Sequence, residues 1–318
     1  MTNSLFATPH PSTDCKAGQS LAKQWQGVTS CSLLVAISLM TSTSAFSHNS
    51  THNQGAGLLA TGGASQIEGT AGGGLVPMAV LAGYGTDDSN HGAGFFSRAN
   101  TDDYELTAFG IAWSWHNRVE FSLARQELNI APISNALGLS NDFLVQNIAG
   151  LKVRLAGDLI YDTLPQLSLG IQYKHNEDFL IPQAVSADRE HDIDLYIAAS
   201  KLYLAGLAGK NLLLNGVIRA TRANQGGLIG FGGDKDKHHS FVFEGSAGIF
   251  LNKHWLVGAE YKDKPDNLSF AEEDPWHDVF IAWFPNKQWS VVAAYVNLGS
   301  IAGLEDQTGW YLSLAGSY

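Results

Sequence analysis

Alternation of apolar and polar positions is the dominant pattern along this chain, and it is clearest in the last ten residues, 309–318. Trp310, Leu312, Leu314 and Tyr318 fall on one face of an extended chain, because side chains alternate with period two. The residues on the other face are mostly small or polar. This pattern is typical of the closing strand of an outer-membrane β-barrel, which pairs with the first strand because lipid cannot satisfy an open sheet edge.

Similar segments recur along the chain, separated by turn-forming residues. They predict an all-β protein, a transmembrane antiparallel up-and-down β-barrel occupying residues 61–318. The expected strands lie near 61–69, 75–85, 92–100, 104–115, 118–127, 145–156, 166–175, 193–204, 211–223, 241–251, 254–263, 276–284, 288–298 and 309–318.

The connections between these segments alternate between short and long. Short connections such as 116–117 and 285–287 alternate with long ones such as 128–144 and 264–275. This is the rhythm of short periplasmic turns and longer extracellular loops. With both ends of the barrel in the periplasm the strand number must be even, so we expect about fourteen strands, with twelve as the alternative.

Tryptophans provide a separate indication of the topology. Most of them fall near the predicted strand ends, and Trp at both membrane interfaces forms the aromatic belt of a lipid-facing barrel. A soluble β-sandwich, the alternative, would bury its tryptophans in the middle of its strands. The periplasmic ends hold Trp113, Trp115, Trp255, Trp283 and Trp289, and the extracellular ends hold Trp276 and Trp310.

Composition fits a barrel. Hydrophobic residues make up 45% of the chain and charged residues 15%, against about 25% charged in a soluble domain. No apolar run after the N-terminal region is long enough for a spanning helix. The net charge of −11 disfavours nucleic-acid binding, because phosphate contacts need clustered Lys and Arg.

The N-terminus has the pattern of an export signal. Lys16 and Lys23 precede the apolar run 33–40, which is followed by small residues ending at Ser47. We interpret residues 1–47 as a secretory signal peptide cut after Ser47, with a membrane anchor as the alternative. Residues 48–60 have no periodic pattern and are expected to be a flexible periplasmic leader. Both cysteines lie within the predicted signal, as suits a protein exported to an oxidising compartment.

Charged residues recur on the face opposite the apolar one. Charge facing lipid is costly, so these side chains are expected to line the lumen. They could border a water-filled channel or pair across a packed interior. The lumen-lining candidates are Glu120, Lys152, Arg154, Arg219, Glu244, Glu260, Lys262 and Asp278.

Other features carry weaker predictions. Acidic residues crowd the long loops, as in 272–274, where they could bind divalent cations or form solvated loops bridged to lipopolysaccharide. Their spacing matches no dedicated metal site, so no metal or cofactor is expected. Residues 226–233 are too apolar for an ordinary exposed loop and could fold inward or rest on the outer leaflet.

No catalytic residues are predicted. His277 and Asp278 are adjacent in a strand and point to opposite faces, so they cannot orient one another. The chain also lacks a G-x-S-x-G elbow. A membrane-embedded hydrolase therefore stays a minor alternative.

Several sequence blocks resemble the domain-of-unknown-function 3034 family of Gram-negative bacteria. The resemblance runs from about Gly57 to the C-terminus and implies an outer-membrane protein without an established activity. The blocks that carry it are 57–77, V-E-F-S-L-A-R-Q at 119–126, G-L-K-V-R-L-A-G-D at 150–158, R-A-N-Q-G-G-L-I-G-F-G-G at 222–233, G-A-E-Y-K-D-K-P-D-N-L at 258–268 and A-W-F-P-N-K at 282–287.

Together these patterns predict a barrel in the cell outer membrane that passes small solutes through its lumen. The alternative role is a closed structural or binding barrel that uses its acidic extracellular loops. Expected partners are outer-membrane lipid, lipopolysaccharide and the barrel-assembly machinery, the last through the strand Trp310–Tyr318. The sequence leaves a homo-oligomer open.

Overall fold

The computed structural model describes residues 59–60, 62, 64–85, 89–131, 134, 142–301 and 303–318. The predicted signal peptide and residues 48–58 of the predicted leader lie outside the described residues. Those described belong to one compact unit, Asn53–Tyr318. None of the helices among them is long and apolar enough to cross a membrane.

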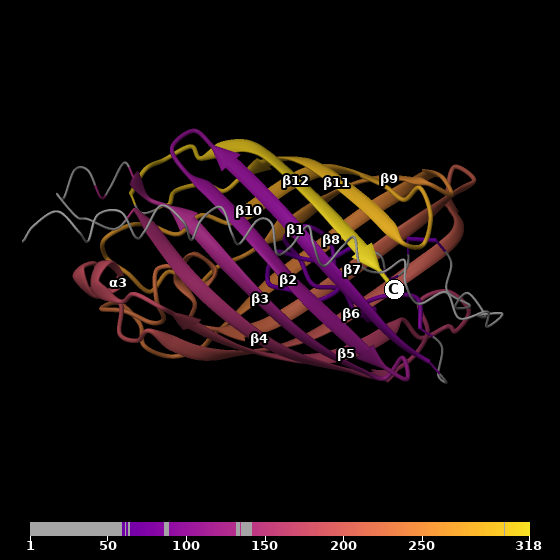
Figure 1. Cartoon of the computed structure of the whole chain (residues 1–318), viewed down its shortest axis with the longest axis horizontal. Coiled ribbons are helices and arrows are strands. Elements are labelled where there is room, and N and C mark those ends of the chain that lie inside the picture. Colours follow the sequence, from indigo (N-terminus) through magenta and orange to yellow (C-terminus); the bar gives the residue numbers. More distant parts are fainter. Residues whose placement is uncertain are drawn as a thin grey trace, which may run out of the picture. The chain divides into compact units, whose positions relative to one another are not determined.

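Twelve antiparallel strands among the described residues form a closed barrel (Figure 1). β1 pairs with β12 from Ala93↔Ser317 to Thr101↔Gly309, so no sheet edge stays open. The strands are β1 (Asn90–Thr101), β2 (Glu105–Trp115), β3 (Val119–Asn129), β4 (Phe143–Ala156), β5 (Gln166–Asn176), β6 (His191–Leu207), β7 (Lys210–Thr221), β8 (Ser240–Asn252), β9 (Trp255–Lys262), β10 (Trp276–Trp283), β11 (Trp289–Asn297) and β12 (Thr308–Ser317).

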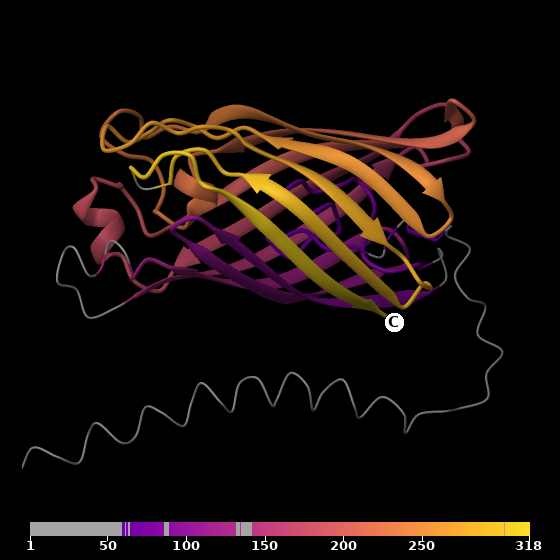
Figure 2. The same cartoon turned by 90° about the horizontal axis from the view of Figure 1, so that it is seen from above.

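The prediction of fourteen strands is wrong, and the alternative of twelve is confirmed. The segments 61–69 and 75–85 form no strand of the barrel. Instead, residues 64–84, which we call the plug segment, run through turns inside the barrel (Figure 2). The apolar residues of 75–82 follow one another without polar alternation, and such a run does not distinguish a strand from any other buried segment.

Connection lengths define the two ends of the barrel. The predicted alternation of short and long connections is observed. Tight turns such as His116–Asn117, where both residues have positive φ, join strands at the short-turn end. The C-terminus also lies there (Figure 1). The opposite, long-loop end carries α3 (Leu180–Ala184) and the short 3-10 helix η2 (Asn224–Gly227).

The outward face of the strands is apolar, as expected for lipid-facing strands. Ile111, Phe121 and Leu123 are each more than half exposed. Tryptophans form a belt at the short-turn end, and Trp310 is exposed near the long-loop end. Trp276, predicted for the belt, points inward instead and is 3% exposed. The period-two pattern of β10 places Trp276 on the same face as the buried Asp278.

Candidate functional site in the barrel lumen

The plug segment enters and leaves the lumen at the short-turn end. Gly83 N donates to Gly62 O at 2.8 Å, and Ala60 N donates to the Tyr84 hydroxyl at 3.1 Å, so the two ends of the segment lie side by side. Ser114, close to the last residue of β2, donates to Ala82 O at 2.7 Å. The plug segment is therefore a loop inserted from one end of the barrel.

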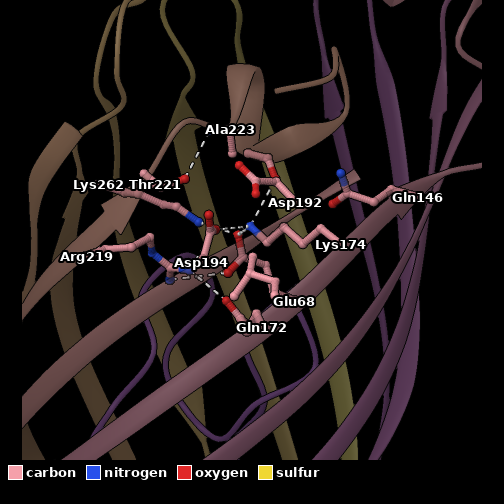
Figure 3. Close-up of polar contacts among 12 residues, drawn as sticks. Glu68, Gln146, Gln172, Lys174, Asp192, Asp194, Arg219, Thr221, Ala223 and Lys262 are labelled. Atoms are coloured by element: carbon pink, nitrogen blue, oxygen red, sulfur yellow. Dashed lines mark hydrogen bonds and ion pairs between the residues drawn. The ribbon is translucent and has the colours of Figure 1, made fainter. Parts of the chain in front are cut away.

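Glu68 of the plug segment lies among three cationic side chains of the wall. Its Oε1 is 2.7 Å from Lys262 Nζ and 2.9 Å from Lys174 Nζ, and its Oε2 is 3.3 Å from Arg219 Nη2. These cations come from β9, β5 and β7, and they converge on Glu68 (Figure 3). All four side chains are at most 5% exposed, so the cluster is closed to solvent.

The wall supplies further partners to the same cations. Arg219 pairs with Glu244 at 2.5 Å, lies 3.3 Å from Asp194 and donates to Gln172 at 2.6 Å. Lys174 Nζ is 2.9 Å from Asp194 Oδ2. Three cations thus face three carboxylates, two from the wall and one from the plug segment. We call Lys174, Arg219 and Lys262 the cationic cradle.

A second contact between wall and plug is centred on Glu120 of β3. Its carboxylate accepts hydrogen bonds from the Thr70 hydroxyl at 2.5 Å, Ala71 N at 3.3 Å and Ala82 N at 2.7 Å. Lys152 Nζ lies 3.3 Å from Glu120 Oε1 and donates to Ala71 O at 3.1 Å. Here the wall provides the charges and the plug segment provides neutral partners.

A third contact joins the plug segment to Glu260 of β9. Leu75 N donates to Glu260 Oε2 at 2.6 Å. Gly73 packs so closely that a Cβ built there would lie 1.8 Å from Glu260 Oε1, so a larger residue would require the carboxylate or the plug segment to shift. Asp278 of β10 lies directly opposite Glu260 in the strand register.

Uncharged wall side chains hold the remaining plug backbone. Ala79 N donates to the Ser200 hydroxyl at 2.8 Å, and the Ser168 hydroxyl donates to Ala79 O at 2.5 Å. Asn215 Nδ2 donates to Pro77 O at 3.0 Å. Polar side chains of the wall therefore bind the plug backbone at Pro77 and Ala79, while other backbone groups of the segment, such as Ile67 N with Gly74 O, bond to one another.

Residues 222–233, which we call the lid, close the lumen at the long-loop end. They fold inward rather than outward: Phe231 is fully buried. Asn176 Nδ2 donates to Gly227 O at 2.8 Å, and Lys174 Nζ donates to Gly226 O at 3.0 Å. Lys174 therefore contacts both the lid and, through Glu68, the plug segment.

A buried ion pair supports the lid from the β9–β10 loop. Lys264 Nζ lies 2.9 Å from Glu273 Oε2 and donates to Gln225 Oε1 at 3.0 Å, while Gln225 N donates to Glu273. Burial lowers the pKa of Lys264, and burial raises the pKa of Glu273, because both charged forms are desolvated. The same lysine lies 5.0 Å from the centre of the Trp276 ring.

The sequence candidates fall into two groups. Arg154 is separate from the others: it lies beside the β4 bulge at the short-turn end, 3.3 Å from Asp158. The remaining candidates are buried inside the barrel, namely Glu120, Lys152, Arg219, Glu244, Glu260, Lys262 and Asp278.

Three residues of the central cluster were missed by the sequence analysis. Lys174 and Asp194 occupy inward positions of β5 and β6, so the period-two pattern could have identified them. Glu68 lies outside every strand and carried no such signal. Elsewhere, His277 is exposed and Asp278 buried, and no group of three or more His, Cys, Asp or Glu in the described part of the chain could hold a metal ion.

Comparison with solved structures gives distant similarities. The KdgM porin is 10% identical, with a TM-score of 0.45, covering 71% of this chain and 99% of its own. The COG4313 outer membrane channel from Pseudomonas putida F1 is 12% identical, with a TM-score of 0.43 over 77% and 97%. Outer membrane phospholipase A from Escherichia coli is 8% identical, with a TM-score of 0.37 over 76% and 94%.

These three proteins differ in their stated roles and do not separate a channel from an enzyme. Among curated proteins, none matches this chain in sequence. A family of proteins of unknown function, DUF3034, matches residues 61–315, which include the plug segment and almost the entire barrel. The chain belongs to the DUF3034 family.

Proposed function

We propose that this protein is a gated outer-membrane channel for small solutes, with residues 64–84 as a retractable plug. The observation that carries the proposal is the polar wall behind the plug segment. Replacing buried ion pairs by well-packed apolar residues is often neutral or stabilising, so a permanently dry interior has no need of them. A lumen that fills with water in another state does need a polar wall.

The attachment of the plug segment also fits a gate. Apolar side chains such as Leu75 and Val76 pack in the core with wall residues, and the plug segment is also held by hydrogen bonds and ion pairs. Water can replace these polar contacts once the segment withdraws. Its two ends lie together at the short-turn end, so the segment can leave the lumen without threading through the barrel. The apolar outward face and the predicted signal peptide support insertion into the outer membrane.

Single-channel conductance of the refolded protein in a planar bilayer tests the proposal. In one variant a short Gly-Ser linker replaces residues 63–82, because Gly62 and Gly83 are already hydrogen-bonded to each other. Removing the obstruction should give large, long-lived open steps. In the full-length chain, Glu120→Gln should raise the open fraction, because it weakens three hydrogen bonds to the plug segment.

Glu127→Gln is the matched control, since Glu127 lies on the outward face of the same strand and should leave the open fraction unchanged. The alternative role, a closed structural or binding barrel, predicts a different result. If the linker variant is folded and inserted but conducts no current, the channel proposal is wrong.

A further inference from the structure

The cationic cradle holds a carboxylate that does not belong to the wall. Glu120 and Glu260 are wall carboxylates that bind neutral groups of the plug segment. At Glu68 the arrangement is reversed, because the plug segment supplies the anion and three wall strands supply the cations. Withdrawal of the plug therefore affects this site differently from the other two.

Charge counting shows what withdrawal leaves behind. Within the cluster the wall contributes the three cations of the cradle and two carboxylates, Asp194 and Glu244. Without Glu68 the site carries one unbalanced positive charge and lysine donors that have lost an acceptor. Leaving such a charge unpaired in a narrow lumen is costly, so an open channel would bind an anion there.

The geometry selects a carboxylate of single charge. Lys262 and Lys174 both lie within 2.9 Å of one oxygen of Glu68, and Arg219 lies 3.3 Å from the other. The second oxygen, Oε2, accepts no hydrogen bond from the described residues. A carboxylate that is not tethered to a backbone could turn toward Arg219 and make that bond.

We propose that the cationic cradle is the solute-binding site of the channel, that its solutes are small monocarboxylates, and that Glu68 occupies the site in the closed state. Glu68 therefore competes with the solute for the cationic cradle, and its binding there holds the plug segment in the lumen. Binding of a free carboxylate displaces Glu68 and favours withdrawal, because each ligand stabilises the state that it binds. This inference rests on the channel function proposed above.

Chemical rescue tests the site without requiring conduction. Glu68→Ala in the full-length exported chain removes the carboxylate and leaves space for a small one. Sodium acetate at several times its dissociation constant should raise the thermal unfolding midpoint of this variant by roughly 2–4 °C relative to equal sodium chloride. Gln66→Ala, a control in the same segment with a fully buried neutral side chain, should show no difference between the salts.

The carboxylate site would be overturned if acetate and chloride shifted the unfolding midpoint of Glu68→Ala equally. It would also be overturned if acetate shifted the midpoints of Glu68→Ala and Gln66→Ala equally. If Glu68→Ala does not refold, Glu68→Gln keeps the side-chain shape and supports a second measurement, the reversal potential in an acetate-to-chloride gradient. Selectivity for acetate is expected, and adding Lys262→Gln should abolish it. Equal permeability of the two anions through an open pore would overturn the proposed solute class.

The two measurements separate the proposals. Rescue by acetate in a protein that never conducts, even with the plug segment replaced by the linker, would retain the carboxylate site and reject the channel. Conduction without rescue or acetate selectivity would retain the channel and reject the site.

Discussion

Glu260 of β9 and Asp278 of β10 face one another in directly opposed positions, both at least 96% buried, and neither forms an ion pair with a Lys, Arg or His among the described residues. Elsewhere in the lumen, acidic groups such as Asp194 have a cationic partner. Two buried carboxyl groups at opposed positions cannot both be ionised without mutual repulsion and the cost of desolvation. The described part of the barrel therefore contains an acidic pair that no cation compensates.

Asp278→Asn should stabilise the protein, because an amide avoids the repulsion and desolvation that two opposed carboxyl groups incur without a cation, and it keeps the side-chain shape. We expect a gain on the order of 0.2–1 kcal/mol in the free energy of unfolding. Asp194→Asn, the same substitution at a buried aspartate that pairs with Lys174 and Arg219, should instead cost roughly 3–5 kcal/mol. Urea unfolding in detergent measures both, and a loss of stability in Asp278→Asn would contradict the assignment of repulsion.

Glycine at position 73 should be required for plug seating. A Cβ there would lie 1.8 Å from Glu260 Oε1, so Gly73→Ala must displace either the carboxylate or the plug segment. The expected results are an increased open fraction in bilayer recordings and faster proteolysis within residues 64–84.

Gly216→Ala is the matched control for that substitution, because a Cβ built there would lie 3.8 Å from Phe243 Cε2, at ordinary van der Waals distance. It should behave as the unsubstituted protein. Equal conductance and proteolysis of the two alanine variants would show that the contact between Gly73 and Glu260 does not hold the plug segment.

Strand periodicity explains how much of this architecture could be predicted. In β9, alternation placed Glu260 and Lys262 opposite Trp255, and the structure buries the first two and exposes the third. The rule acts on neighbouring residues of a single strand, so it needs no knowledge of the remaining fold. The same rule places Trp276 on the face of Asp278, but Trp276 was assigned to the belt from its aromatic character near a strand end, which says nothing about which face the side chain occupies.

The plug segment could not be predicted by the same rule. Its residues are buried on every side, so the segment has no polar face from which a period could be read. Its position depends on contacts with residues far away in sequence, such as Glu68 with Lys262, 194 residues later. The cationic cradle was therefore only partly identified: Arg219 and Lys262 were found, but the carboxylate that they bind was not.

Lys174 should couple the plug segment to the lid. Its Nζ contacts Glu68 at 2.9 Å and Gly226 O at 3.0 Å. Lys174→Met should thus speed amide hydrogen exchange in both segments, for example at Ala71 and Ile229. Lys262→Met breaks a contact with Glu68 of similar length, and no hydrogen bond joins Lys262 to the lid, so it should speed exchange at Ala71 more than at Ile229. Identical exchange patterns in the two variants would argue against coupling through Lys174.

The ion pair Lys264–Glu273 should impose two opposite slopes on stability as a function of pH. Burial raises the pKa of Glu273 above its ordinary value of 4.5, so the folded state binds that proton more tightly, and stability falls as pH rises from 4.5 through the folded-state pKa. Burial lowers the pKa of Lys264 below 10.5, so the unfolded state holds the proton at higher pH, and stability rises between the folded-state pKa and 10.5.

The double substitution Lys264→Met with Glu273→Leu should flatten both slopes, because neither proton then differs between the folded and unfolded states. Urea midpoints measured from pH 4 to pH 10 on the double variant and the unsubstituted protein give the comparison. Lys235→Met with Asp266→Leu removes a pair whose two side chains are about 40% exposed and serves as the control. Because an exposed pair is screened by solvent, both slopes should persist there. Slopes that survive in the double variant at 264 and 273 would assign the pH dependence of stability to other groups.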